Sequence, residues 1–218
     1  MKAIAIAVVL NIGPIYAAGG LSYSYVEGIY AQLETDSDEV GSATAGGMMR
    51  EATIRGAARL TEHLFVYGGF SNGDLSDVNG LDELALAAEI DASATTSARS
   101  IGAGLQLEPV ADLSLYARAG YVSRKVVVSF TLGDSQGFAD KSADGVQAAI
   151  GARASFGRME LFAEGVHTDL SHEQQGDGGA LEIGFELDFS PRLAARAAYL
   201  SIGGDEGFNL SARWYYRR

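Results

Sequence analysis

Apolar residues alternate with acidic residues and one glycine across Leu181–Phe189, which reads LEIGFELDF. Successive side chains of an extended strand point to opposite faces. One face of this strand is therefore apolar, and the other carries Glu182, Gly184, Glu186 and Asp188. A soluble sandwich would bury the apolar face and leave the acids in water, whereas a membrane barrel would place the apolar face in lipid and the acids in a polar lumen.

The first residues of the chain favour export. Met1-Lys2 gives a positive start, Ala3 to Ile12 is apolar, Gly13-Pro14 interrupts the run, and Ala17-Ala18 supplies small residues for cleavage. The run is too short to span a bilayer as a helix. We predict a signal peptide over residues 1–17 and a single barrel domain over 18–218. The alternative is an ordinary N-terminal strand.

Composition excludes several classes of function. The chain has 218 residues, no cysteine and a net charge of -12. Without cysteine there is no disulfide or thiolate chemistry. The acidic balance argues against nucleic acid as a partner, because phosphates require a basic surface. Prolines are scarce, and Pro109 and Pro191 fall between expected strands, where a missing amide does no harm.

The alternation recurs along the chain and predicts an all-β fold with about ten strands. They are expected near residues 21–34, 47–60, 64–73, 96–107, 113–130, 145–156, 159–170, 180–189, 193–202 and 208–216. The connections near 61–63, 108–112, 157–158 and 190–192 are short, and those near 35–46, 74–95, 131–144 and 171–179 are longer and polar. This inequality is typical of a closed antiparallel up-and-down transmembrane β-barrel, with short periplasmic turns and longer extracellular loops.

A weak repeat follows three of the short turns. Leu64 to Tyr67, Leu113 to Tyr116 and Met159 to Phe162 each read apolar, any residue, apolar, aromatic. Strands favour such residues in any case, so we use the repeat only to fix the register.

In that register the polar face carries charges of both signs. An arginine facing lipid near the bilayer midplane would cost about 2–4 kcal/mol, so these residues are expected to face inward. Ion pairs would neutralise the poorly solvated interior and leave the lumen largely closed. The predicted luminal charge network is Glu27, Arg55, Arg118, Arg153, Glu164, Glu182, Glu186, Arg196 and Arg213, with Glu51 and Arg59 on the same face. In a soluble sandwich the same residues would be a solvated face.

Glu27 is the exception to the pattern, because it shares a face with Tyr23, Tyr25 and Ile29. Either the odd-numbered face of this strand is luminal, or a bulge at Gly28 switches the register. We expect a luminal Glu27 paired with Arg55 or another arginine.

The last expected strand places Phe208, Leu210, Ala212, Trp214 and Tyr216 on one face. Trp214 and Tyr216 are predicted to lie in the periplasmic aromatic girdle. Such a strand resembles the signal that the outer-membrane insertion machinery reads, although Arg217-Arg218 extends it beyond the final aromatic residue.

The segment Ser22 to Tyr30, SYSYVEGIY, resembles the first strand of a small proteobacterial outer-membrane β-barrel family of the porin-like or opacity type, which reads S-Y-x-Y-V-E-G-x-Y. The hairpin from Ile54 to Ser71 is similar to the second and third strands of that family. The likeness is specific over the first third of the chain. It implies localisation in the outer membrane and no defined activity, catalytic residue or cofactor.

Catalytic and metal-binding readings have little support. His63 falls in a periplasmic turn, and His167, Asp169, Ser171 and His172 cluster near one strand end. Residues so close in sequence rarely converge into a triad, and their spacing matches no zinc-ligand signature. We therefore predict no enzyme activity, no metal and no cofactor.

The sequence thus predicts an outer-membrane barrel with a structural or surface-interaction role. Alternatives are a narrow channel for ions or small polar solutes, a barrel enzyme acting on lipid, and a secreted soluble β protein. Expected partners are outer-membrane lipid, lipopolysaccharide and the insertion machinery. The acidic loops could gather divalent cations that bridge lipopolysaccharide phosphates. Alternatively, their acidic residues could serve only to keep the protein surface soluble.

Overall fold

The computed structural model describes residues 23–35, 46–79, 90–132, 135–170 and 178–216. The predicted signal peptide, residues 1–17, lies outside this part of the chain, so its prediction stands untested. No helix among the described residues is long and apolar enough to cross a membrane.

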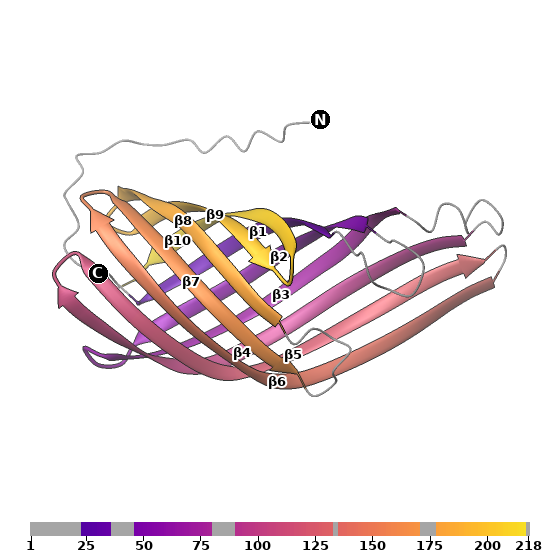
Figure 1. The fold of residues 1–218 in the computed structure, drawn as a ribbon, viewed down its shortest axis with the longest axis horizontal. Helices are drawn as coiled ribbons and strands as arrows, with labels where there is room; N and C mark the ends of the chain where they lie inside the picture. Colours follow the sequence, from indigo (N-terminus) through magenta and orange to yellow (C-terminus); the bar gives the residue numbers. More distant parts are fainter. Residues whose placement is uncertain (1–22, 36–45, 80–89, 133–134, 171–177, 217–218) are drawn as a thin grey trace.

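Ten antiparallel strands form a closed barrel (Figure 1), which confirms the predicted fold class. Each strand pairs with its neighbours in sequence, and the first pairs with the last. The strands are β1 (Tyr25–Thr35), β2 (Gly46–Arg59), β3 (Leu64–Asn79), β4 (Ile90–Val110), β5 (Leu113–Leu132), β6 (Ser135–Phe156), β7 (Met159–Leu170), β8 (Gly178–Ser190), β9 (Leu193–Ile202) and β10 (Asp205–Tyr215).

Short turns close one end of the barrel, as predicted. Residues 60–63, 111–112, 157–158 and 191–192 join β2–β3, β4–β5, β6–β7 and β8–β9. Gly157 has φ 68°, a left-handed conformation that glycine adopts without steric cost. The C-terminal strand ends at this side (Figure 1), which by barrel architecture is the periplasmic side.

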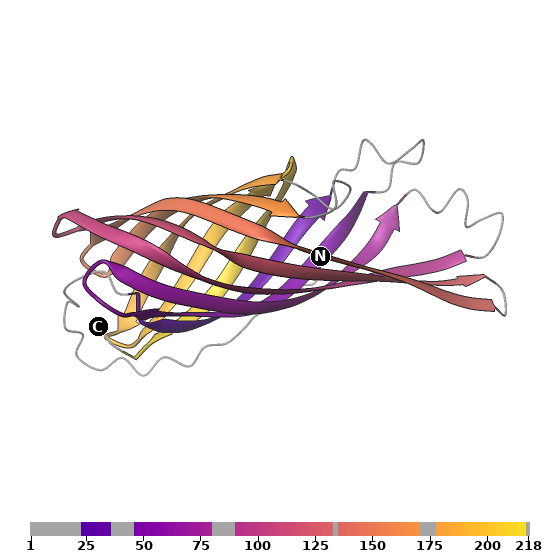
Figure 2. The ribbon, with the colours of Figure 1, turned by 90° about the horizontal axis from the view of Figure 1, so that it is seen from below.

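Three strands continue far beyond the others at the opposite end (Figures 1 and 2). β5 pairs with β6 as far as Leu132 and Ser135, whereas β6 pairs with β7 only from Gly145 onward. The predicted long connection at 131–144 is therefore wrong, because most of it is strand. Both faces of this extension lie beyond the apolar part of the wall, so residues 135–144 lack the alternation from which the other strands were predicted.

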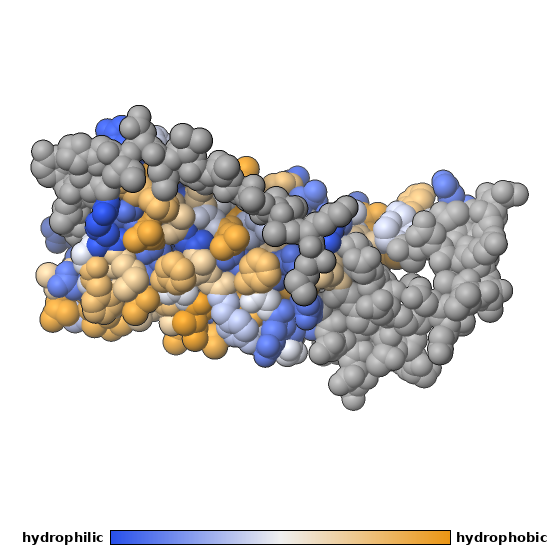
Figure 3. Space-filling model, turned by 90° about the horizontal axis from the view of Figure 1, so that it is seen from above, coloured by the Kyte–Doolittle hydropathy of each residue, from blue (hydrophilic) through white to orange (hydrophobic). Residues whose placement is uncertain are grey.

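The two faces of the wall are inverted relative to a soluble protein. On β8 the apolar side chains of Leu181, Ile183, Phe185 and Leu187 are 41–49% exposed, whereas Glu182 and Glu186 are buried inside. Figure 3 shows apolar side chains gathered on the outer wall toward the short-turn end. Continuous exposed apolar surface of this kind is the mark of a lipid-facing wall, which excludes the sandwich.

Aromatic residues mark the upper limit of that wall. On five strands an exposed outward aromatic side chain is followed, two residues closer to the long loops, by an outward polar residue. The pairs are Tyr30 and Gln32, Phe70 and Asn72, Tyr121 and Ser123, Tyr199 and Ser201, and Phe208 and Glu206. Aromatic rings prefer the membrane interface, so the apolar band ends at these five positions.

Candidate functional site in the lumen

The nine residues of the predicted charge network all lie on inward faces, and they come from β1, β2 and β5 to β10. Arg153, Glu164, Glu182, Glu186, Arg196 and Arg213 are buried, and Glu27 is fully buried. The two ion pairs of Glu27 join directly opposed residues on neighbouring strands, whose Cβ atoms lie about 5 Å apart.

Glu27 lies at the seam where the first strand meets the last. Its direct cross-strand partners are Arg55 on β2 and Arg213 on β10. Arg55 Nε donates to Glu27 Oε2 at 2.7 Å, Arg213 Nη2 donates to the same oxygen at 3.0 Å, and Ser211 Oγ donates to Oε1 at 2.5 Å. No register shift interrupts β1. The odd-numbered face is therefore luminal, and the alternative bulge at Gly28 is absent.

Glutamates oppose one another across β7 and β8. Glu160 faces Glu186, and Glu164 faces Glu182, in the register of these strands. We call these four residues the acidic ladder. Like charges placed directly opposite destabilise a strand pair, so the ladder requires cations from neighbouring strands.

Arginines on both sides supply those cations. Arg118 on β5 donates from Nε and Nη2 to the two oxygens of Glu164, at 3.1 and 2.7 Å, and Arg153 on β6 donates to Glu160 at 2.5 and 2.8 Å. From the other side, Arg196 Nη2 donates to Glu182 Oε1 at 2.8 Å. Bidentate arginine–carboxylate pairs are the strongest of these contacts.

Arg213 connects the ladder to the seam. Its Nη1 lies 2.8 Å from Glu186 Oε2, while its Nη2 bonds Glu27. The hydroxyl of Tyr215 also donates to Glu186, and Asn209 Nδ2 donates to Glu182 at 3.0 Å. The result is a continuous chain of ion pairs, buried except at Arg55, that runs from β1 and β2, through β10, to β8.

Sequence reasoning missed Glu160 and Tyr215, although a signal for Glu160 was present. In the repeat after the short turns, the second and fourth positions both face inward: Phe65 and Tyr67, Ser114 and Tyr116, Glu160 and Phe162. The unrestricted second position is thus luminal. Tyr215 lies between the outward Trp214 and Tyr216, so alternation alone places it inside.

Aromatic side chains fill the lumen near the short turns. Tyr23 stacks on Phe65, with ring centroids 4.7 Å apart, and meets Tyr116 edge-on at 5.7 Å. The guanidinium carbon of Arg153 lies 4.9 Å from the centroid of the Tyr23 ring. Cation–π contacts of this kind strengthen when desolvated, so the aromatic group and the charge network stabilise each other.

Luminal glycines make room for these rings. Phe65 lies directly opposite Gly104, and Tyr116 lies opposite Gly151. A Cβ added at Gly104 would come within 2.2 Å of Phe65 Cζ, and one at Gly151 within 2.3 Å of Tyr116 Cζ. The rings therefore lie over backbone that has no side chain.

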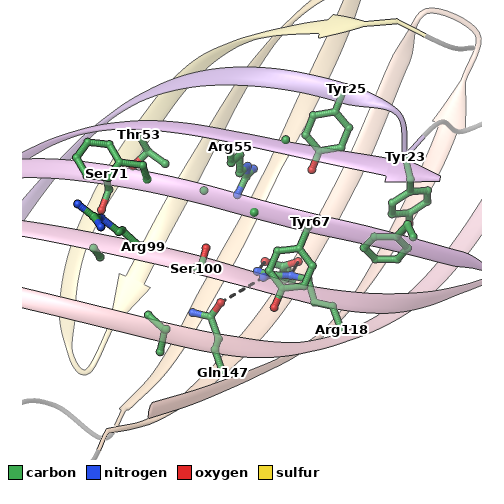
Figure 4. Close-up of a pocket in the computed structure, with 18 of the residues that line it drawn as sticks. Tyr23, Tyr25, Thr53, Arg55, Tyr67, Ser71, Arg99, Ser100, Arg118 and Gln147 are labelled. Carbon is green, nitrogen blue, oxygen red and sulfur yellow. Dashed lines mark hydrogen bonds and ion pairs between the residues drawn. The ribbon is translucent and has the colours of Figure 1, made fainter. Parts of the chain in front are cut away.

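The side of the lumen opposite β8 is built differently. Apart from Phe65, Tyr67 and Gln106 near the short turns, inward positions of β3 and β4 carry small residues, which we call the small-residue wall: Gly69, Ser71, Gly73, Ala98, Ser100, Gly102 and Gly104. Beside it lies a cavity of about 260 Å³, lined also by Arg55, Arg118 and Gln147 (Figure 4). A second cavity of about 220 Å³ shares Glu51, Ser71, Ala98 and Arg124 with the first.

Only part of the weakly supported catalytic cluster lies within the described residues. His167 and Asp169 are exposed on the outward face of β7, away from the lumen, while Ser171 and His172 lie outside the described residues. His63 is in the β2–β3 turn. Within the described residues no group of three or more histidine and acidic side chains could hold a metal ion.

The last strand ends with the two girdle candidates. Trp214 and Tyr216 are 49% and 42% exposed on the outer wall, and their ring centroids lie 6.3 Å apart. The hydroxyl of Tyr216 donates to the carbonyl of Ala57 at 2.8 Å. Residues 217–218, which extend past the final aromatic, lie outside the described residues.

Comparisons with known proteins agree with this architecture. The model of the outer membrane protein beta-barrel domain family matches residues 3–212, so the chain belongs to that family and is an outer-membrane protein. This confirms the family resemblance and the localisation predicted from the sequence. A search of the curated proteins found no match.

The chain is similar to several solved structures at low sequence identity, and the first of these shares its fold. The translocator domain of the autotransporter NalP from Neisseria meningitidis is 12% identical, with 90% of each chain covered and a TM-score of 0.55. The N-terminal β-barrel domain of Pseudomonas aeruginosa OprF is 15% identical over 91% of this chain and 99% of that one, with a TM-score of 0.38. Neisserial surface protein A is 12% identical over 89% and 98%, with a TM-score of 0.40.

Proposed function

We propose that this outer-membrane barrel has a structural or surface-interaction role, and that its own side chains close its lumen. The observation that carries the proposal is the continuous network of buried ion pairs joining Glu27, Arg213 and Glu186 across the barrel seam. A conducting pore keeps water-filled space along its axis, whereas here buried charges bind one another.

Passage of an ion would require the network to open. Breaking a buried pair leaves an uncompensated charge, at a cost of about 3–5 kcal/mol. Near the short turns, Tyr23 and Phe65 are almost fully buried in the aromatic group and form a second barrier. The ion-pair network and the aromatic group lie in the same lumen, so a solute that passes through would have to displace both.

The outer surface supports contact with lipid. The apolar wall ends in outward aromatic residues toward the long loops and in Trp214 and Tyr216 toward the short turns. Two aromatic belts are what a barrel needs to hold its depth in a bilayer. Outer-membrane lipid and lipopolysaccharide are thus the proposed surroundings, and the aromatic last strand is the proposed signal for the insertion machinery.

The extension of β4, β5 and β6 supports a surface role. From Ser123 to Leu132, β5 continues past the aromatic boundary for roughly 30 Å, at about 3.3 Å per residue. Phe138 on β6 is 78% exposed there. The extension therefore presents strand surface to the medium outside the cell.

Conductance in planar lipid bilayers tests the closed lumen. We expect no stable current steps from the wild type. Replacing Tyr23 and Tyr116 together by alanine should introduce them, because the aromatic group then loses two of its rings. The control is Tyr121→Ala, which removes an outward ring and should leave the bilayer silent. Stable current steps in the wild type that continue unchanged in the double variant and in Tyr121→Ala would contradict the proposal.

The second candidate is a narrow channel for ions or small polar solutes. The cavity of about 260 Å³ beside the small-residue wall favours it, because that part of the lumen is not filled. Reproducible wild-type steps that change size on Tyr23→Ala would establish this candidate in place of the first.

A further inference from the structure

Arginines outnumber acidic residues around the cavity beside the small-residue wall. Seven of the described residues that line it are arginines and two are glutamates. In two of the ion pairs the arginine is the more exposed partner: the side chain of Arg55 is 26% exposed and its partner Glu27 is 0% exposed. Arg118 is likewise more exposed than Glu164, at 15% against 8%. In both pairs the arginine is the more exposed partner, and Glu27, unlike Glu164, does not line the cavity.

Several guanidinium donors facing this space have no acceptor among the described residues. Arg55 uses Nε to bind Glu27, and its Nη1 lies 4.0 Å from Glu182, beyond hydrogen-bond distance. Arg124, which lines both cavities, makes no ion pair or hydrogen bond with the part of the chain that is described. These two arginines come from β2 and β5, on either side of the small-residue wall.

The small-residue wall completes the arrangement with hydroxyl groups. Ser71 and Ser100 lie beside the cavity, as does Gln147, whose Oε1 accepts a hydrogen bond from Arg118 Nη1 at 3.2 Å (Figure 4). A Cβ at Gly69 would lie 3.3 Å from Arg55 Cβ and 3.4 Å from Ser100 Oγ. The glycine therefore keeps the space between the arginine and the hydroxyl group free.

We propose that this cavity binds a small oxyanion, a solute carrying a carboxylate or phosphate group, that enters from the extracellular side. Guanidinium groups bind such oxygens through charge-assisted hydrogen bonds, and clefts lined by one sign of charge concentrate the opposite ion. The positive lining stands out in a chain with a net charge of -12.

Size and surroundings limit the ligand. A cavity of about 260 Å³ is at the small end of ligand sites, which suits a single phosphate or a small carboxylic acid. Glu51 lies toward the shared part of the two cavities, where its Oε1 accepts a hydrogen bond from Thr53 Oγ1 at 2.7 Å. This carboxylate disfavours a long polyanion that would extend from the cavity toward Arg124.

The test is a titration of the folded full-length barrel with inorganic phosphate, in micelles of a sugar-headgroup detergent that contains no phosphate. Phosphate replaces chloride at constant ionic strength, and nuclear magnetic resonance follows the Nε–H signals of Arg55 and Arg118. We expect shifts that saturate. Arg124→Gln breaks no ion pair among the described residues, so it should fold, and it should raise the phosphate concentration for half-saturation about tenfold, as the loss of a charged hydrogen bond predicts.

The matched control is Arg50→Gln, because Arg50 is exposed on the outer face of β2, lines neither cavity and should leave the titration unchanged. Shifts that do not saturate, or equal effects of both variants, would overturn the site. A second arm adds phosphatidylglycerol at the same phosphate concentration. No shift is expected, and a shift would assign the response to lipid headgroups. Conductance decides the proposed function separately, because a closed barrel and a conducting one can each bind or fail to bind phosphate.

Discussion

The acidic ladder on β7 and β8 and the small-residue wall on β3 and β4 lie on opposite sides of the same lumen. One presents Glu160, Glu164, Glu182 and Glu186, all buried and bound to arginines. The other presents glycine, alanine and serine. Both obey the same alternation, so periodicity decides which residues face inward, and residue size and charge decide how the lumen is filled.

The two sides differ in what each would lose on substitution. On the ladder side, removing one partner leaves a buried charge without compensation. On the small-residue side, adding a methyl group drives a side chain into packed neighbours. Four substitutions separate these effects.

The largest effect is expected at the seam. Glu27→Ala removes the carboxylate shared by Arg55 and Arg213 and should lower the free energy of unfolding by about 3–5 kcal/mol. Urea titration in lipid vesicles, followed by Trp214 fluorescence, measures the change. Glu34→Ala on the same strand, at an exposed position, serves as the control. A loss below about 1 kcal/mol would show that the buried network is dispensable.

A smaller effect is expected on the opposite wall. Gly104→Ala places a Cβ 2.2 Å from Phe65 Cζ and 2.8 Å from the carbonyl oxygen of Ala117, so about 1–3 kcal/mol should be lost. Gly28→Ala is the matched control, since nothing lies within 4 Å of its added Cβ.

A second substitution sharpens that result. Phe65→Leu shortens the side chain above Gly104, so the double variant should recover part of the loss caused by Gly104→Ala. The same urea titration reads this coupling. Strict additivity of the two losses would show that the ring over the glycine is not the cause.

The smallest effect is expected in the extension. Lys125 Nζ lies 3.1 Å from Asp140 Oδ2, and both side chains are about half exposed. Exposed pairs contribute little, so Lys125→Ala should change the free energy of unfolding by less than about 1 kcal/mol. The pair has the chemistry of the ladder without its burial. A loss as large as that of Glu27→Ala would remove burial as the explanation.

The sequence was sufficient to predict the fold because a barrel in lipid must alternate on every strand that crosses the apolar band. Leu181 to Phe189 shows this without interruption, and the strand count follows from its recurrence. Alternation also predicted a luminal Glu27, on the alternative that the odd-numbered residues of the first strand face inward. Beyond Gly145, where lipid no longer constrains the outer face, the pattern fails, and residues 135–144 of β6 were mistaken for part of a loop, although the facing part of β5 was predicted as a strand as far as residue 130.

Partners within the lumen required the register between strands. The inward phase of Arg118 and Glu164 could be read from each strand alone, yet their contact spans 46 residues and two strand pairs. The direct opposition of Glu160 and Glu186 depends on the length of the β7–β8 connection, whose residues 171–177 give no such information in sequence. The cavity could not be predicted from the alternation, because it exists where the inward residues of β3 and β4 are small, and the alternation shows which residues face inward but not the space they leave.

The seam also has a kinetic consequence. Glu27 and Arg213 are 186 residues apart, whereas the Arg55–Glu27 and Arg213–Glu186 pairs each lie within 30 residues of sequence. Each half can assemble early by local hairpin closure, but the contact between halves must await the last and most distant strand pairing. We expect Arg213→Gln to slow the final closing step of refolding more than it slows hairpin formation, as stopped-flow folding into vesicles would measure; equal slowing of both phases would contradict this order. When β1 pairs with β10, the Arg55–Glu27 and Arg213–Glu186 pairs lose water together. The contact between the first and last strands therefore forms only when the barrel is complete.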